Sequence, residues 1–188
     1  MSRRGLPGLL RVYARTAWWG LVSPRVAESE PLLVHQAVVL RDEHVLLSVR
    51  SDIRGWELPG GNPEPGEAGE ETLRRELLEE TGIEVEAERR VGDYVRRGFR
   101  PHTARVWQCR PVGGALCPSA ETPIVAWFPV AALPTTLLPW YRGPLADALA
   151  AHPEPVVRRE RWGVSEIAQA ISIDLRMRLS DDRAGRVA

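Results

Sequence analysis

Residues 61–83 read GNPEPGEAGEETLRRELLEETGI, a turn rich in glycine and proline that runs into a segment with helical periodicity. Glu76, Glu79 and Glu80 are spaced i, i+3 and i+4, so on an α-helix their carboxylates project from one face. Like charges at this spacing destabilise an isolated helix by about 0.2–0.5 kcal/mol per pair, so the pattern predicts a compensating cation. Oxygen ligands alone indicate a hard ion, Mg²⁺ or, as a substitute, Mn²⁺.

The neighbours of these glutamates predict how the helix is held. Leu73 and Leu77 are spaced i, i+4 and form an apolar stripe that can face a core. Arg75 lies four residues before Glu79 and can orient a metal-binding carboxylate through hydrogen bonds. Gly82 permits the left-handed conformation that ends many helices. One face of the helix is therefore expected to pack and another to coordinate.

Three glutamates taken alone are typical of a solvated helix face. The complete spacing is more specific, because it fits the pattern GX5EX7REUXEEXGU, with U aliphatic, at Gly61, Glu67, Arg75, Glu76, Leu77, Glu79, Glu80, Gly82 and Ile83. On these residues the segment resembles the Nudix box, and the preceding WELPG of residues 56–60 resembles the strand that leads into the box in that family. Outside the box the resemblance covers about 120 residues through the order of elements only.

The resemblance implies an α/β fold, the Nudix-type α/β/α sandwich with a mixed β-sheet. It implies metal ligation by Glu76, Glu79, Glu80 and the backbone carbonyl of Gly61. The remaining box residues would support the loop and helix, namely Glu67, Leu77, Gly82 and Ile83, together with Gly61 itself. The implied reaction is attack of water on phosphorus in the diphosphate linkage of a nucleoside diphosphate joined to another moiety.

The catalytic base is less sharply indicated than the metal site. Glu76 or Glu79 could take the proton, with Arg75 beside them as a further catalytic residue, but a carboxylate that coordinates metal is a weakened base. Glu121 precedes the strand expected at residues 124–128 and resembles the late loop glutamate of several Nudix enzymes. An exposed loop acid without a catalytic role is the alternative for Glu121.

Substrate-binding candidates are arginines that could hold phosphate and aromatic rings that could stack on a base. They are Arg50, Arg54, Trp56, Arg96, Phe99 and Arg100. For each of them a surface or packing role is the alternative. The sequence marks that separate substrate subtypes within the family are not in place, so nucleotide sugars, ADP-ribose-like compounds and normal or oxidised nucleoside triphosphates all stay open.

The chain has 188 residues and zero formal net charge, and all 25 basic residues are arginine. This length fits one domain with decorated ends: an N-terminal amphipathic extension at 1–30, a Nudix hydrolase domain at 31–151 and a C-terminal extension at 152–188. Balanced charge argues against a stable nucleic-acid complex, so the expected partner is a small-molecule nucleotide. Two cysteines allow at most one disulfide, which favours unpaired thiols and a cytoplasmic location.

Periodicity predicts the remaining elements. A hairpin is expected from two apolar runs at 33–40 and 44–49, and further strands and a helix are expected at 85–95, 103–110, 124–128 and 137–151. Residues 171–179 alternate apolar and polar side chains strictly, which predicts an edge or hairpin strand in the C-terminal extension.

Residues 6–22 predict an amphipathic helix that packs on its own domain or on a second copy in a homodimer. Membrane-surface contact by this helix is the less favoured alternative, raised by Trp18, Trp19 and the absence of acidic residues before Glu28.

Three other functions compete with hydrolysis of a small nucleotide. Removal of pyrophosphate from RNA 5′ ends would use arginine clusters as a track for the backbone. A sensor that binds a nucleotide without turnover would be expected to carry a degenerate box, and this box is complete. Isomerisation of an isoprenoid diphosphate would require a catalytic cysteine and histidine set, which Cys109 and Cys117 alone do not supply.

Overall fold

The computed structural model describes residue 14, residues 32–98 and residues 101–184. Apart from Ala14, the helix expected at 6–22 lies outside the described residues, as do the substrate-binding candidates Phe99 and Arg100. In chain order the elements are β1 (Leu33–Arg41), β2 (His44–Val49), β3 (Trp56–Glu57), β4 (Gly60–Gly61), α2 (Gly69–Thr81), β5 (Ile83–Gly98), β6 (His102–Gly114), β7 (Ile124–Pro129), η2 (Val130–Ala132), α3 (Pro139–Ala150), β8 (Val156–Trp162) and α4 (Val164–Ala184).

The strands form one mixed sheet that opens into a fork. The order is β3-β2-β1-β6-β5-β8, with β1 parallel to β6 and β5 parallel to β8. The predicted hairpin is confirmed, but β1 pairs with β2 only at Leu40 and Arg41, beside the turn. Further back along β1, His35 and Gln36 pair with the two glycines of β4. The glycine turn of the box is therefore anchored to a central strand of the sheet.

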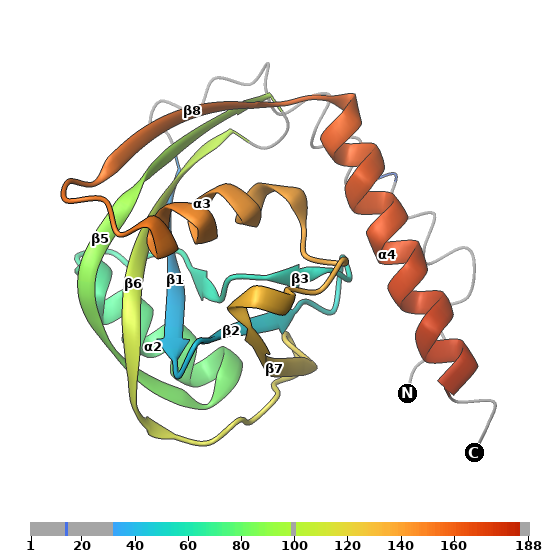
Figure 1. The fold of residues 1–188 in the computed structure, drawn as a ribbon, viewed down its shortest axis with the longest axis horizontal. Helices are drawn as coiled ribbons and strands as arrows, with labels where there is room; N and C mark the ends of the chain where they lie inside the picture. The colour runs from blue at the N-terminus through green and yellow to red at the C-terminus, as the bar shows by residue number, and fades with distance from the viewer. Residues whose placement is uncertain (1–13, 15–31, 99–100, 185–188) are drawn as a thin grey trace.

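Helices cover the two faces of the sheet, as Figure 1 shows for α2 and α3 around β1 and β6. Leu73 and Leu77 of α2 are buried in one apolar cluster with alternate residues of β1, which confirms the predicted leucine stripe. Leu145 and Ala148 of α3 pack in a second cluster against the opposite face. The α/β/α arrangement follows from strands whose side chains are buried on both faces.

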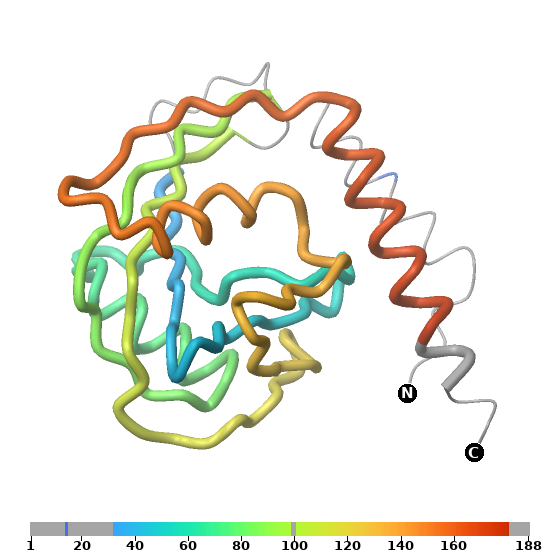
Figure 2. The backbone as a smooth tube through the Cα atoms, viewed as in Figure 1, coloured from blue at the N-terminus to red at the C-terminus, as the bar shows by residue number. Residues whose placement is uncertain are grey.

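The C-terminal extension does contain an edge strand, but the strand is β8 and not residues 171–179. Figure 2 shows the chain passing from β8 directly into α4, which runs beside the domain. Residues 171–179 are helical, so the strand prediction there was wrong. Within residues 164–180, Ala170, Ile173 and Asp174 are buried and Met177 packs against the same core cluster, a spacing of three and four that fits a helix.

Across the described ranges, we find no helix that combines the length and the apolar character needed to cross a bilayer.

Candidate active site

The helix of the box, α2, is defined at both ends by local hydrogen bonds. At its start, the carboxylate of Glu71 accepts the backbone N–H of Ala68 at 3.1 Å. At its end, Gly82 adopts φ 73° and its N–H donates to Leu78 O at 3.0 Å. The predicted left-handed end of the helix is confirmed. A side chain at residue 82 would also meet Ala115 O at 2.4 Å, so glycine is required there for two reasons.

Arg75 links the turn of the box to its helix. Its guanidinium donates to both carboxylate oxygens of Glu67 at 2.9 Å and to Glu76 Oε1 at 2.9 Å. The hydrogen bond from Arg75 lowers the pKa of Glu67 to about 2, so Glu67 stays ionised and keeps Arg75 in place. Glu79 is a weaker partner, at 3.7 Å from Arg75. Arg75 therefore orients Glu76 more directly than Glu79.

Two of the three glutamates predicted to bind metal lie against the glycines of β4. A Cβ atom added to Gly61 would lie 2.3 Å from the carboxylate carbon of Glu76, so glycine leaves the space that this carboxylate fills. Glu80 accepts the backbone N–H of Gly60 at 3.1 Å. Burial, assisted by the negative charge of Glu76, raises the pKa of Glu80 to about 7. The box thus brings two carboxylates and an accessible stretch of backbone together.

Glu79 differs from the other two, because its side chain is 63% exposed. Within the described residues no three His, Cys, Asp or Glu side chains converge into a ready-made metal site. The donors nevertheless fit a hard divalent ion, since they are carboxylate oxygens.

The loop that carries Glu121 is fastened to the end of α2. Thr122 Oγ1 donates to Glu80 O at 2.5 Å, and Cys117 N donates to Thr81 O at 2.9 Å. These bonds place Glu121 close enough for its charge to act on Glu80. The structure therefore brings the predicted base, whose side chain is 66% exposed, next to the carboxylate helix.

Arg50 joins this group from the end of β2. Its Nη2 lies 3.5 Å from Glu121 Oε1, and its guanidinium donates to both oxygens of Asp52 at 3.0 and 3.3 Å. Burial alone would raise the pKa of Asp52, but the hydrogen bond and charge of Arg50 outweigh it and lower that pKa. Among the described substrate-binding candidates, Arg50 lies beside the acidic residues of the site.

The loop after Arg50 is held by α4. The backbone N–H of Arg54 donates to Asp174 Oδ1 at 2.6 Å, and Arg178 Nη2 donates to Asp52 O at 2.8 Å. Asp174 is fully buried and also accepts Arg178 Nε at 2.9 Å. The C-terminal helix is thereby connected to a wall of the site.

Sequence reasoning missed Glu57. This residue is 7% exposed and accepts a hydrogen bond from Tyr141 OH at 3.1 Å. Burial raises the pKa of Glu57 to about 8, with Glu80 adding to the effect and Arg50 opposing it. The sequence signal for Glu57 was a single acidic residue among the apolar residues and glycines of WELPGG, because acidic side chains are rarely buried in an interior strand.

Two other candidates take structural roles. The guanidinium of Arg96 is buried, donates to Glu160 Oε2 at 3.2 Å and to Trp140 O at 2.9 Å, and lies 4.7 Å from the ring centre of Trp162. These contacts occupy it, so Arg96 is not available to a substrate in this conformation. Trp56 packs edge-on against Phe128 with ring centres 4.6 Å apart, which is a core contact.

Comparison with known proteins places this geometry in a family. A model of the NUDIX domain matches residues 31–148. The chain belongs to the Nudix family. It is a Nudix hydrolase, and such enzymes act on phosphoric anhydride bonds in small nucleotide substrates.

Three relatives illustrate the range of this Nudix hydrolase's neighbours. The chain is 37% identical over 129 residues to a MutT-like protein of Streptomyces ambofaciens, covering 67% of this chain and 83% of that one. It is 36% identical over 112 residues to the CTP pyrophosphohydrolase of Escherichia coli, covering 55% and 80%. The solved ADP-ribose pyrophosphatase of Streptococcus suis aligns with a TM-score of 0.57 and 25% identity, over 70% of this chain and all of that one.

Proposed function

We propose that this Nudix hydrolase is a Mg²⁺-dependent pyrophosphohydrolase that cleaves the diphosphate linkage of a nucleoside triphosphate, normal or oxidised, with Mn²⁺ as a substitute ion. The proposal rests mainly on two contacts: the Glu76 carboxylate packs closely against Gly61, and Glu80 accepts a hydrogen bond from the N–H of Gly60. Relatives named CTP pyrophosphohydrolase and putative 8-oxo-dGTP diphosphatase, at 36% and 33% identity, support the triphosphate class, and the ADP-ribose pyrophosphatase of known structure is less similar at 25% identity.

Glu76, Glu80 and the carbonyl of Gly61 would hold the divalent ion, with Glu79 joining from the exposed side of α2. When bound, the ion neutralises phosphate oxygens and makes a coordinated water a stronger nucleophile. Arg75 would hold Glu76 in the orientation that ligation requires, because Glu67 fixes Arg75 from its other side.

Glu121 is our candidate for the group that takes the proton from the attacking water, at its carboxylate. It is tied to the helix by the Thr122 bond and is not itself one of the box carboxylates. Arg50, beside Glu121, is suited to bind phosphate oxygens through its guanidinium. Water attack on phosphorus then releases two phosphorylated products without a covalent enzyme intermediate.

The test is Mg²⁺-dependent product release across nucleoside triphosphates, 8-oxo-dGTP, nucleotide sugars, ADP-ribose and triphosphorylated RNA. Wild type is compared with Glu80→Gln and with Glu70→Gln, the same chemical change at an exposed position on the same helix. Activity on a triphosphate that Glu80→Gln loses and Glu70→Gln keeps is expected. Binding without turnover would instead favour the sensor function, and turnover of RNA alone would favour the RNA 5′-end function.

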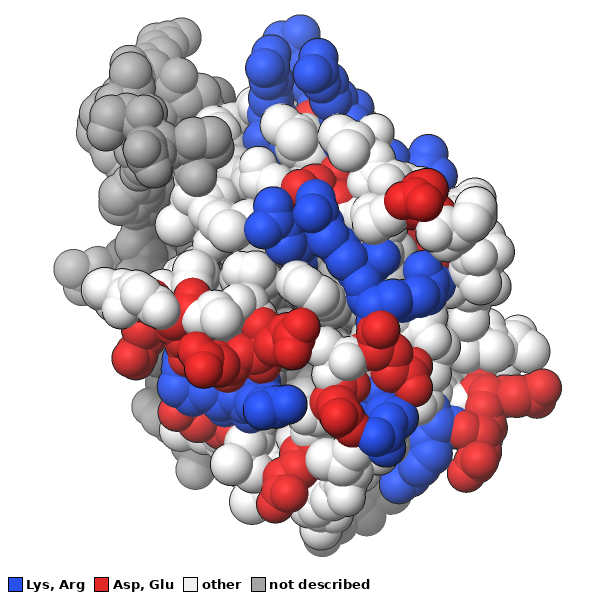
Figure 3. Space-filling view, turned by 90° about the vertical axis from the view of Figure 1, so that its left-hand side faces the viewer, with Lys and Arg blue, Asp and Glu red and all other residues white. Residues whose placement is uncertain are grey.

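The surface bears on the RNA alternative. On the face seen in Figure 3, arginine and acidic side chains are interspersed. Ion pairs among the described residues include Asp93 with Arg105 and Glu86 with Arg110. Paired charges neutralise one another, so the charge distribution supports a small-molecule substrate better than a track for a nucleic-acid backbone.

We also propose a cytoplasmic location, since Cys109 and Cys117 are both free thiols. Titration of thiols in protein taken directly from cells should find both; a disulfide-linked or blocked pair would argue against it. A homodimer through the terminal extensions remains a prediction, which light scattering of the full chain and of a chain lacking residues 1–30 would test.

A further inference from the structure

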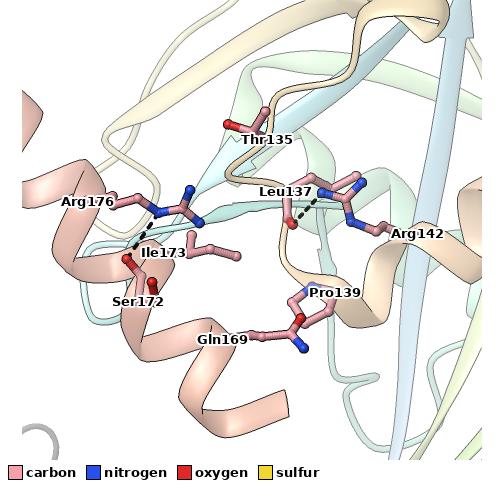
Figure 4. Close-up of a pocket in the computed structure, with 8 residues that line it drawn as sticks. All are labelled: Thr135, Leu137, Pro139, Arg142, Gln169, Ser172, Ile173 and Arg176. Carbon is pink, nitrogen blue, oxygen red and sulfur yellow. Dashed lines mark hydrogen bonds between the residues drawn. The ribbon is translucent and has the colours of Figure 1, made fainter. Parts of the chain in front are cut away.

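A pocket of about 160 Å³ lies at the seam between α3 and α4 (Figure 4). One wall is the segment that leads into α3, from Thr135 to Pro139, and the other wall is α4. None of its lining residues belongs to the candidate active site. The pocket is therefore a separate feature of the molecule, built with a helix that lies beyond the residues matched by the family model.

Two arginines face this pocket from opposite sides. Figure 4 shows Arg142 extending from α3 and Arg176 from α4 toward the space between the helices. Each makes one long hydrogen bond to a backbone oxygen, Arg142 to Leu137 at 3.5 Å and Arg176 to Ser172 at 3.4 Å. Among the described residues neither has a carboxylate within ion-pair distance. Two positive charges around one hollow repel each other, so the pocket favours an anion.

The rest of the lining defines what kind of anion fits. Thr135, Gln169 and Ser172 offer hydroxyl and amide groups, whereas Leu137 and Ile173 are buried and apolar. At about 160 Å³ the pocket is smaller than the about 300 Å³ at which sites for drug-sized ligands begin. A phosphate-sized group fits this space, and guanidinium groups bind phosphate oxygens in a bidentate geometry.

We propose that the α3–α4 seam is a second anion site, which binds a phosphate or diphosphate group as a free ion or at the end of a small metabolite. Since Arg142 belongs to α3 and Arg176 to α4, a bound anion bridges the two helices and holds α4 on the domain. The proposal does not depend on the reaction at the box.

The test is titration calorimetry of the full chain with sodium phosphate, sodium diphosphate and adenosine monophosphate, at low salt and with EDTA so that divalent ions do not contribute. Arg142→Gln and Arg176→Gln are each expected to weaken diphosphate binding about tenfold or more, because each removes a charge-assisted contact. The matched control is Arg159→Gln, at another exposed arginine that forms no ion pair among the described residues. Arg50→Gln, which removes the guanidinium proposed to bind phosphate in the active site, should bind diphosphate at the seam as wild type does.

Hydrogen exchange gives a second readout that does not rely on affinity. Diphosphate should slow exchange in residues 164–180 of the wild type and leave it unchanged in the double variant Arg142→Gln, Arg176→Gln. Both arginines are exposed, so ligand-free melting temperatures should stay at the wild-type value.

Equal binding by the double variant and wild type would overturn the proposal, and so would binding lost only in Arg50→Gln, which would assign the anion to the active site. Tighter binding of adenosine monophosphate than of phosphate would assign the group to a metabolite, whereas equal binding would assign it to the free ion. Both of these results support the site. If the chain hydrolysed none of the tested substrates, the proposed function would fail, but anion binding at the seam could still be measured. The two proposals can therefore fail independently.

Discussion

Replacing Asp174 by alanine tests how α4 is attached to the site. The carboxylate is fully buried and accepts hydrogen bonds from the Arg54 N–H at 2.6 Å and from Arg178 at 2.9 Å. Removing one partner of a buried ion pair costs about 3–5 kcal/mol, and the lower end applies because the Arg178 side chain is 24% exposed. A loss of about 3 kcal/mol should lower the melting temperature by about 6–12 °C for a chain of this size.

The expected functional effect is on KM more than on kcat, because the loop that Asp174 holds carries Asp52, the partner of Arg50. The assay is a double-mutant cycle of Asp174→Ala and Arg178→Ala, followed by urea unfolding and by steady-state kinetics. If the two single changes add within about 0.5 kcal/mol in the double variant, the residues are not coupled and the reasoning is refuted. A fall in kcat at unchanged KM would contradict the assigned role of the loop.

Three further changes test the box and its surroundings. Gly61→Ala should reduce kcat about 100-fold with little change in substrate affinity, because the new methyl group would lie 2.3 Å from the Glu76 carboxylate carbon. The measurement is steady-state kinetics at saturating Mg²⁺, and a near-normal kcat would contradict the close packing of Glu76 on Gly61. Burial raises the pKa of Glu57 from 4.5 to about 8, so between these pH values the folded state keeps a proton that the unfolded chain releases, and the free energy of unfolding falls as pH rises. Glu57→Gln should reduce this pH dependence, measured by urea unfolding at pH 5 and pH 8 with EDTA. The same pH dependence in the variant and in wild type would count against the raised pKa of Glu57. Thr122→Val should lower the free energy of unfolding in urea by about 1–3 kcal/mol, because Glu80 O loses the hydrogen bond from Thr122. It should also lower kcat, because the loop that carries the proposed base Glu121 is held less firmly. A variant as stable as wild type would show that Thr122 does not hold this loop.

The box helix could be predicted because its pattern contains all of its own determinants. Leu77 and Glu76 differ by one position, so any helix that buries the leucine presents the glutamate on an adjacent face. The left-handed end at Gly82 is likewise a local property. The strands around it followed from runs of apolar residues that are buried on both faces of the sheet.

The C-terminal helix could not be predicted from periodicity over nine residues. Residues 171–179 place an apolar side chain at every second position, yet Leu175 and Leu179 are exposed and only part of the pattern faces the domain. The alternating pattern shows only which side chains are apolar. The residues of α4 that become buried are those that pack on α3 and its surroundings, which come earlier in the chain. The choice between strand and helix was therefore made by tertiary contacts.

The roles of single arginines were also out of reach for the sequence. Arg96 is buried by Glu160 and Trp162, which lie more than sixty positions away, while Arg50 is kept near the site by Asp52, only two positions away. A guanidinium can serve packing or binding equally well, and its partners decide.

The fork between β1 and β2 separates two tasks in this molecule. The glycines of β4 pair with β1, and β1 pairs with β6. The backbone that contacts Glu76 and Glu80 is therefore part of the sheet and shares its rigidity. The walls, residues 50–54 and 115–122, are loops fastened by a small number of hydrogen bonds to α4 and to the end of α2. Changes in residues 51–54 would therefore reshape one side of the site while β4 keeps the box carboxylates in place, whereas changes in residues 115–122 would also act on Glu121, the proposed base.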